Sequence, residues 1–287
     1  MRVLTLYVAA VVILPASCFG LVALPHPYSR AAKTAMPRRH GNTEQGLKLT
    51  AGGGPSLKAD AASTASSTDA GTASSLSRAR DVLLDPVFRN MHLPLMATAG
   101  AVLGPNLDNY HSAFGVLTYK NPIELSIAGH VLVTTDWWVP PLFAVAGAGI
   151  GGLYILLDAA FETPQAKREP AWRDVFLSIS LFSFQYYLSG LLTAAGCPYW
   201  VLVASLAVIA ERVFNLFDAT RVGMFVSLAT ATLGPLIEVL LVNVTDLYMY
   251  NSSDFFGVDS WIPVVYFCGG PAVGSLARAL YVKLHRE

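Results

Sequence analysis

Charged residues are scarce in this 287-residue chain, at 13% of the total, and the formal net charge is zero. A balanced charge leaves no basic surface for nucleic acid, which excludes it as a class of partner. Cysteine is also scarce: Cys18, Cys197 and Cys268 lie far apart, so we expect neither a structural disulfide nor a metal site. Apolar residues, at 54%, and a mean hydropathy of +0.49 instead indicate a membrane protein.

Recognisable catalytic motifs are missing as well. The chain has no Gly-rich phosphate loop, no His-Glu-x-x-His and no Gly-x-Ser-x-Gly, and its six histidines are scattered one by one. These absences predict a protein without catalytic residues, without a metal and without a cofactor.

The most informative stretch runs from Asp136 to Asp158, which enclose 21 uncharged residues. At about 1.5 Å of rise per residue, a helix of this length crosses a hydrocarbon core of about 30 Å. Trp138 lies at the entry, where indole rings favour the headgroup level. Small residues such as Gly147 and Gly151 give this helix a smooth face, which favours close packing against another helix.

Three regions are predicted along the chain. Residues 1–18 have an arginine, an apolar run and small residues before Cys18, as in a signal peptide. Residues 19–77 begin as a basic, acid-poor, transit-like segment and end in an Ala/Ser/Thr/Gly-rich linker that is expected to be disordered. This two-part presequence favours a plastid membrane, with the endoplasmic reticulum as the alternative. Residues 78–287 form the membrane domain.

Six apolar segments predict an all-α, six-span membrane protein: Leu93–Leu107, Trp137–Leu157, Trp172–Ala194, Tyr199–Val213, Val222–Val242 and Trp261–Ala277. Residues 123–134 could add an interfacial helix. With six spans, eleven basic residues fall on one side and only Lys120 on the other, so both termini are expected on the cytosolic or stromal side. Arg278 is counted here as a tail base.

Polar residues at bilayer depth are candidates for binding, because an ionisable group there costs at least about 2.5 kcal/mol. Glu238, in the fifth segment, is either a polar anchor for a ligand or partner, or a carboxyl near the outer headgroups. The third segment carries polar-tipped side chains that could line a cavity between helices. The candidate ligand-binding residues are therefore Phe182, Gln185, Tyr186, Trp138 and Glu238.

Four ordered blocks resemble the insulin-induced gene (Insig) family of membrane proteins: W-W-V-P-P with Asp158, the helix opened by Trp172, F-D-A-T-R-V-G at 217–223, and the block from Asp254 to Arg278. The resemblance implies a non-catalytic regulator that binds a membrane lipid or sterol and docks another polytopic membrane protein, in feedback control of sterol or lipid synthesis. It places Phe182 in the ligand cavity and Asp218, with Arg221 and Asp158, at the partner contact.

In this interpretation Asp218 is a solvent-accessible acid beside Arg221, so Asp218→Ala is expected to leave thermal stability nearly unchanged. A homo-oligomer is a further possible assembly. The alternative function is a transporter or lipid-handling enzyme of a plastid membrane.

Overall fold

The computed structural model describes residues 61–287; the predicted signal peptide and most of the transit-like segment fall outside this range. The described part is mostly helical: α2 (Ala61–Leu84), α3 (Leu93–Ala113), α4 (Val139–Ala160), α5 (Gln165–Arg168), α6 (Trp172–Ala194), α7 (Tyr199–Phe217), α8 (Arg221–Leu240) and α9 (Ile262–Arg286). Single π-helical turns, η1 (Phe88–His92) and η2 (Leu241–Thr245), precede α3 and follow α8. Strands β1 (Leu117–Tyr119), β2 (Ile123–Ile127), β3 (His130–Thr135) and β4 (Tyr248–Tyr250) complete it.

Each of the six predicted apolar segments is a helix, namely α3, α4, α6, α7, α8 and α9. Four of them, α4, α6, α7 and α8 with its extension to Thr245, are long and apolar enough to cross a membrane. The chain is therefore a multi-pass helical membrane protein.

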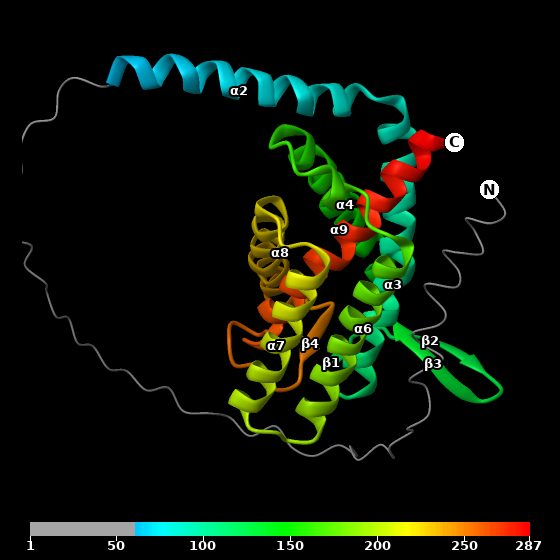
Figure 1. Cartoon of the computed structure of the whole chain (residues 1–287). Coiled ribbons are helices and arrows are strands. Elements are labelled where there is room, and N and C mark those ends of the chain that lie inside the picture. Colours follow the sequence, from blue (N-terminus) through cyan, green and yellow to red (C-terminus); the bar gives the residue numbers. More distant parts are fainter. Residues whose placement is uncertain (1–60) are drawn as a thin grey trace, which may run out of the picture.

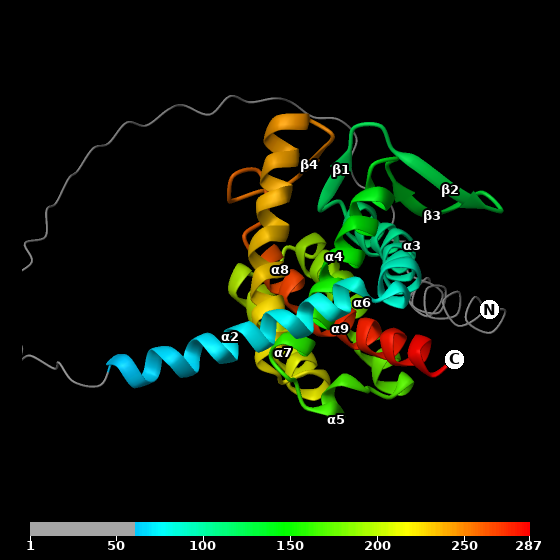
Figure 2. The same ribbon diagram turned by 90° about the horizontal axis from the view of Figure 1, so that it is seen from above.

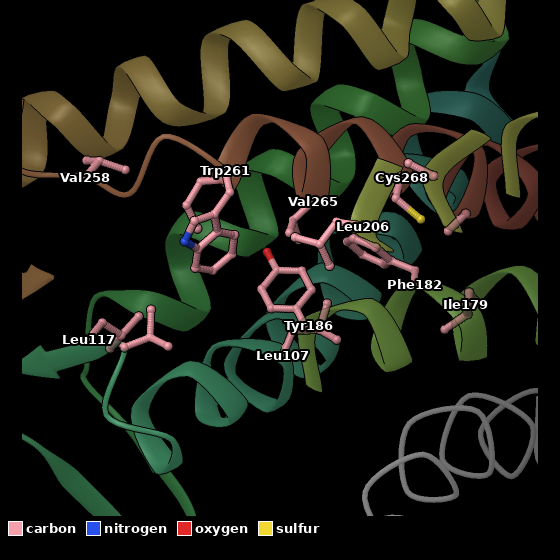
Figure 3. Close-up of a cluster of buried hydrophobic side chains, with 14 of the residues drawn as sticks. Leu107, Leu117, Ile179, Phe182, Tyr186, Leu206, Val258, Trp261, Val265 and Cys268 are labelled. Carbon is pink, nitrogen blue, oxygen red and sulfur yellow. The ribbon is translucent and has the colours of Figure 1, made fainter. Parts of the chain in front are cut away.

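Helix α9 lies at the centre of the bundle and contacts α4, α6, α7 and α8. Figure 2 shows α9 running among the other helices when the molecule is seen from above. Its side chains at Val265, Cys268 and Ala272 are 0% exposed, because they face neighbouring helices rather than lipid. In Figure 3 Val265 and Cys268 lie beside Tyr186 and Phe182, in the core that α6 and α9 share.

Helices α3 and α4 approach each other through glycine, as the small-residue face of α4 predicted. A Cβ built on Gly147 would lie 2.5 Å from the carbonyl oxygen of Met96, and one built on Gly100 would lie 2.1 Å from that of Phe143. No side chain fits at either position, so the two backbones pack directly against each other.

The segment considered as an interfacial helix is a β-hairpin, so that interpretation was wrong. Strands β2 and β3 pair antiparallel and project from the body beside α3 (Figure 1). Ile123, Leu125 and Ile127 alternate with polar residues, which is the two-residue period of a strand and not the period of a helix. Strands β1 and β4 form a second antiparallel pair, which joins the loop after α3 to the loop after α8.

The predicted disordered linker is also corrected, because helix α2 spans Ala61–Leu84. Figure 1 shows α2 as a long helix across one end of the bundle. Alanine forms helix well without burial, a preference that the argument from low apolar content ignored. Near the end of α2, the Arg78 guanidinium donates to the carbonyl oxygens of Ala159 and Ala160 at 3.0 and 2.9 Å, and thereby caps α4.

Candidate functional site

A buried arginine lies between two carboxylates at the base-rich end of the bundle. Arg278, on α9, has a side chain that is only 1% exposed. Its Nε and one terminal nitrogen donate to the two Asp158 oxygens at 2.6 and 2.9 Å, which is the two-pronged geometry that suits a guanidinium. Its other terminal nitrogen lies 3.2 Å from Asp218 Oδ1. The ends of α4 and α7 therefore meet at one positive charge on α9.

Hydroxyl groups complete this site around the second carboxylate. Tyr154 Oη donates to Asp218 Oδ2 at 2.9 Å, and Thr220 Oγ1 donates to Asp218 Oδ1 at 2.5 Å. Thr220 also caps α8, because its Oγ1 accepts from the Gly223 amide at 2.9 Å. The Tyr154 ring lies under the Arg278 guanidinium, 4.8 Å from ring centroid to Cζ.

Gly223 is required by the position of Asp218. A Cβ on residue 223 would lie 2.0 Å from Asp218 Oδ2, closer than any real contact. The first turn of α8 can therefore approach the carboxylate only without a side chain. The sequence F-D-A-T-R-V-G supplies in order the carboxylate, the cap and the glycine that this junction of α7 and α8 needs.

The electrostatics of the site follow from its burial. Asp158 and Asp218 are 2% and 0% exposed, so neither carboxylate has bulk water to stabilise its charge. One arginine offsets one of the two negative charges, and the hydroxyl donors of Tyr154 and Thr220 stabilise the other. The arrangement joins α4, the α7–α8 junction and α9 at one buried arginine.

This geometry corrects the interpretation of Asp218 as a solvent-accessible acid beside Arg221. Asp218 is fully buried and pairs with Arg278, whereas the Arg221 side chain is exposed. Arg278 is likewise not a tail base, because α9 continues beyond Ala277 as far as Arg286. The sequence analysis missed Arg278, Tyr154 and Thr220 as site residues. The sequence showed two acids at the ends of apolar helices, and once such acids are buried they need a basic partner, but it did not show that they are buried or which base pairs with them.

The candidate ligand residues of α6 are packed in the core. Tyr186 stacks on His111 with ring centroids 4.8 Å apart, and the edge of Phe182 faces Gly269 of α9. Figure 3 shows the Tyr186 hydroxyl pointing toward Trp261 and Phe182 lying beside Cys268. These side chains line the contact between α6 and α9, so a ligand would have to displace them.

Gln185 differs from its neighbours because, within the described part of the chain, its side-chain amide nitrogen is hydrogen-bonded and its amide oxygen is not. The side chain is 0% exposed, and its Nε2 donates to the Leu206 carbonyl at 2.9 Å. Its Oε1 is buried and accepts no hydrogen bond from the described residues. An acceptor left unpaired inside a helix bundle costs about 1–3 kcal/mol, so it marks a place that a hydroxyl group would stabilise.

Glu238 and Trp138 belong to an aromatic cluster at the base-poor end. Glu238 accepts hydrogen bonds from the hydroxyls of Tyr250 and Tyr266, which satisfies a carboxyl at this depth. Trp138 packs on Tyr248, with ring centroids 5.2 Å apart. Its Nε1 is buried and donates to no atom of the described part of the chain.

The two buried histidines of the described residues, His92 and His111, have different partners. His92 contacts the Ala277 carbonyl at 3.0 Å, whereas His111 contacts Ser189 Oγ at 2.8 Å. Within the described part of the chain, no group of three His, Cys, Asp or Glu side chains is placed to hold a metal ion.

The fold and the site thus define a helical membrane protein in which the Asp158–Arg278–Asp218 ion pairs connect three helices at one end of the bundle. A family model described as "Insulin-induced protein (INSIG)" matches residues 93–281. The chain belongs to this family.

Curated relatives agree with the family model. The chain is 35% identical to the insulin-induced gene 1 protein of Danio rerio over 161 residues, which cover 54% of this chain and 62% of the relative. It is 33% identical to the proteins of the same name from Bos taurus and Homo sapiens over 150 residues, 52% of each chain. The chain therefore spans only about half to three-fifths of the length of these relatives.

Solved structures agree on the fold. A crystal structure of a mycobacterial Insig homolog from Mycobacterium vanbaalenii matches with a TM-score of 0.56 and 19% identity, over 68% of this chain and 96% of that chain. A cross-linked trimer of that homolog matches with the same TM-score of 0.56 and 20% identity, over 69% and 97% of the two chains. At this identity the likeness establishes the fold alone.

Proposed function

We propose that this protein is a non-catalytic membrane regulator of the Insig type, which binds a hydroxyl-bearing lipid or sterol between its helices and docks another membrane protein. The lipid part rests on one observation: the buried, unpaired Oε1 of Gln185. A hydroxyl on a sterol or diacylglycerol supplies the missing donor, while the apolar remainder replaces contacts now made by Phe182 and Tyr186.

Gln185→Leu tests the lipid proposal. Leucine has a similar volume; it removes the unpaired acceptor but also the bond from Nε2 to the Leu206 carbonyl, so the two effects should offset and the variant should melt close to the unaltered protein. Binding of an oxysterol or a diacylglycerol, measured with radiolabelled ligand in detergent, should fall at least tenfold, since one hydrogen bond to a buried group contributes about 1.4 kcal/mol or more.

Ser183→Ala is the matched control, because the Ser183 hydroxyl lies on the same helix but already donates to the Ile179 carbonyl at 2.9 Å. Its ligand affinity should stay within twofold. Equal affinity of Gln185→Leu and the unaltered protein for both ligands would remove the basis of the lipid proposal.

The docking part of the proposal assigns the partner surface to α7 and α8. Side chains such as Leu216, Phe225 and Leu228 are 53–66% exposed, and α8 is the least buried of the four apolar helices. Asp218 is buried and does not contact the partner itself. Its bonds to Tyr154 and Arg278 hold the α7–α8 junction in place and so fix the relative orientation of the two helices that form this surface.

A photo-crosslinking amino acid at position 225 tests the docking proposal, with position 145 on α4 as the control because Val145 is 72% exposed. Position 225 should crosslink to a second membrane protein and position 145 should not. Crosslinks to lipid alone from both positions, or to a second copy of this chain alone, would contradict it.

The full topology and destination belong to the same proposal. We propose that α3 and α9 also cross the bilayer, which gives six spans and places both ends of the membrane domain on one side. The plastid destination rests on residues outside the described range, whereas the endoplasmic reticulum is the residence typical of the family. Imaging a fluorescent fusion of the full chain decides between them.

A further inference from the structure

A cavity of about 320 Å³ lies at the base-rich end of the bundle, and Gln185 is not among its lining residues. The ends of α2 and α4, the short helix α5 and the last turns of α9 enclose it. Val82, Ile155, Tyr281 and Val282 form its apolar wall, and the Asp158–Arg278 pair forms part of its lining. This volume falls within the range of small-molecule sites.

Most charges around the cavity are already paired. Arg278 is held by Asp158 and Asp218, and Arg286 donates to Glu169. His285 Nε2 contacts Asp85 Oδ2 at 2.9 Å. The two lining acids, Asp158 and Glu169, therefore have basic partners before any ligand enters.

Arg168 is the exception. Its terminal nitrogen donates to Gln165 Oε1 at 2.9 Å, but no carboxylate among the described residues lies within ion-pair distance of it. Its Nε is buried and has no hydrogen-bond partner in the described part of the chain. A buried guanidinium N–H without an acceptor costs more than a neutral donor, so this position favours an anionic oxygen.

From this geometry we propose that the cavity binds a phosphate group, with Arg168 as its principal charged contact. The planar guanidinium can donate two parallel hydrogen bonds to phosphate oxygens, which a lysine could not do. The location supports this chemistry, because the cavity lies at the end of α4, at Ala160, and the end of a membrane-spanning helix lies near the lipid headgroups. The proposal is independent of lipid binding at Gln185.

The first test measures binding of dioctanoyl phosphatidic acid, dioctanoylglycerol and inorganic phosphate to the purified full chain in detergent. Phosphatidic acid should bind at least tenfold more tightly than dioctanoylglycerol. If inorganic phosphate competes with it, the site accepts phosphate from soluble compounds as well as from lipid. Without such competition, the source is a lipid headgroup.

Two variants connect that binding to the cavity. Arg168→Gln should weaken phosphatidic acid binding at least tenfold, because it removes the charge and keeps an amide donor. Arg173→Gln is the control: Arg173 lies on the same side of the bundle, but its side chain is 85% exposed and does not line the cavity. Its affinity should change less than twofold.

Val282→Phe supplies a separate check, because it narrows the cavity without altering charge. It should also weaken phosphatidic acid binding at least tenfold. If Arg168→Gln fails to fold, the affinity of Val282→Phe alone tests whether the ligand binds in this cavity. Equal loss in Arg168→Gln and Arg173→Gln would show unspecific attraction and overturn the proposal. Unchanged binding in Val282→Phe would overturn it as well.

Discussion

Replacing Asp218 by alanine should destabilise this protein strongly, because Asp218 is buried at the meeting point of α4, α7 and α9. The substitution removes the ion pair to Arg278 and leaves the Tyr154 hydroxyl without its acceptor. Breaking a buried ion pair from one side typically costs about 3–5 kcal/mol. Arg278 keeps both bonds to Asp158, so we expect the lower end, about 3 kcal/mol.

The assay is thermal melting of the purified protein in detergent, monitored by its intrinsic fluorescence. A loss of about 3 kcal/mol corresponds to a fall in melting temperature of roughly 6–12 °C for a domain of this size. Asp174→Ala is the matched control: its side chain is 45% exposed and its nearest ion-pair contact, to Arg173, is long at 3.9 Å. It should melt within about 2 °C of the unaltered protein.

Tyr154→Phe and the double variant then show whether the network acts as one unit. Tyr154→Phe alone should cost about 1.5 kcal/mol, because it removes a hydrogen bond to a charged group. In the Asp218→Ala background the same change should cost clearly less, since the hydroxyl has already lost its acceptor. If Asp218→Ala melts normally, or if the two costs simply add, the buried network does not stabilise the fold as one unit.

Three further outcomes are expected. Gly223→Ala should lower the melting temperature by several degrees, because its Cβ would collide with Asp218 Oδ2 at 2.0 Å. An unchanged melting temperature would contradict the close contact between Asp218 and the first turn of α8. Burial raises the pKa of Asp259 to about 6 from 3.8, so stability falls as pH rises through this range, and Asp259→Asn should melt higher than the unaltered protein at pH 7.5 but not at pH 4. In sealed vesicles, single cysteines at Asn251 and Lys283 should react with an impermeant maleimide from opposite sides, since α9 lies between them; reaction from one side would exclude a crossing by α9.

The helices could be predicted from the sequence because membrane helices satisfy their backbone locally. A run of apolar residues fixes each one without reference to the rest of the chain. The third predicted segment, Trp172–Ala194, coincides with α6 residue for residue. That α4 would pack closely against another helix could be predicted for a related reason, because Gly147 and Gly151 recur at helical spacing; that the partner is α3, with its own Gly100 at the contact, could not.

The site could not be predicted in the same way, because its partners are remote in sequence. Arg278 is separated from Asp158 by 120 residues. The count of basic residues in the loops assumes that every base near a helix end is exposed. That assumption assigned Arg278 to the tail, so Asp218 was predicted to pair with its sequence neighbour Arg221. The interfacial helix predicted for residues 123–134 failed for another reason. The prediction used the apolar composition of the segment and ignored the alternation of apolar and polar residues, which is that of a strand.

Helix α9 connects the two regions on which the proposed function depends. At one end Arg278 holds the α7–α8 junction through Asp218, and the Val264 carbonyl lies 3.5 Å from the Gln185 amide nitrogen. These two α9 positions are about 21 Å apart along the helix, at about 1.5 Å per residue. A ligand at Gln185 contacts neither Asp218 nor the exposed face of α8. It can therefore influence docking only by shifting α7, which Gln185 contacts at Leu206, or by shifting α9, whose Arg278 holds the α7–α8 junction through Asp218.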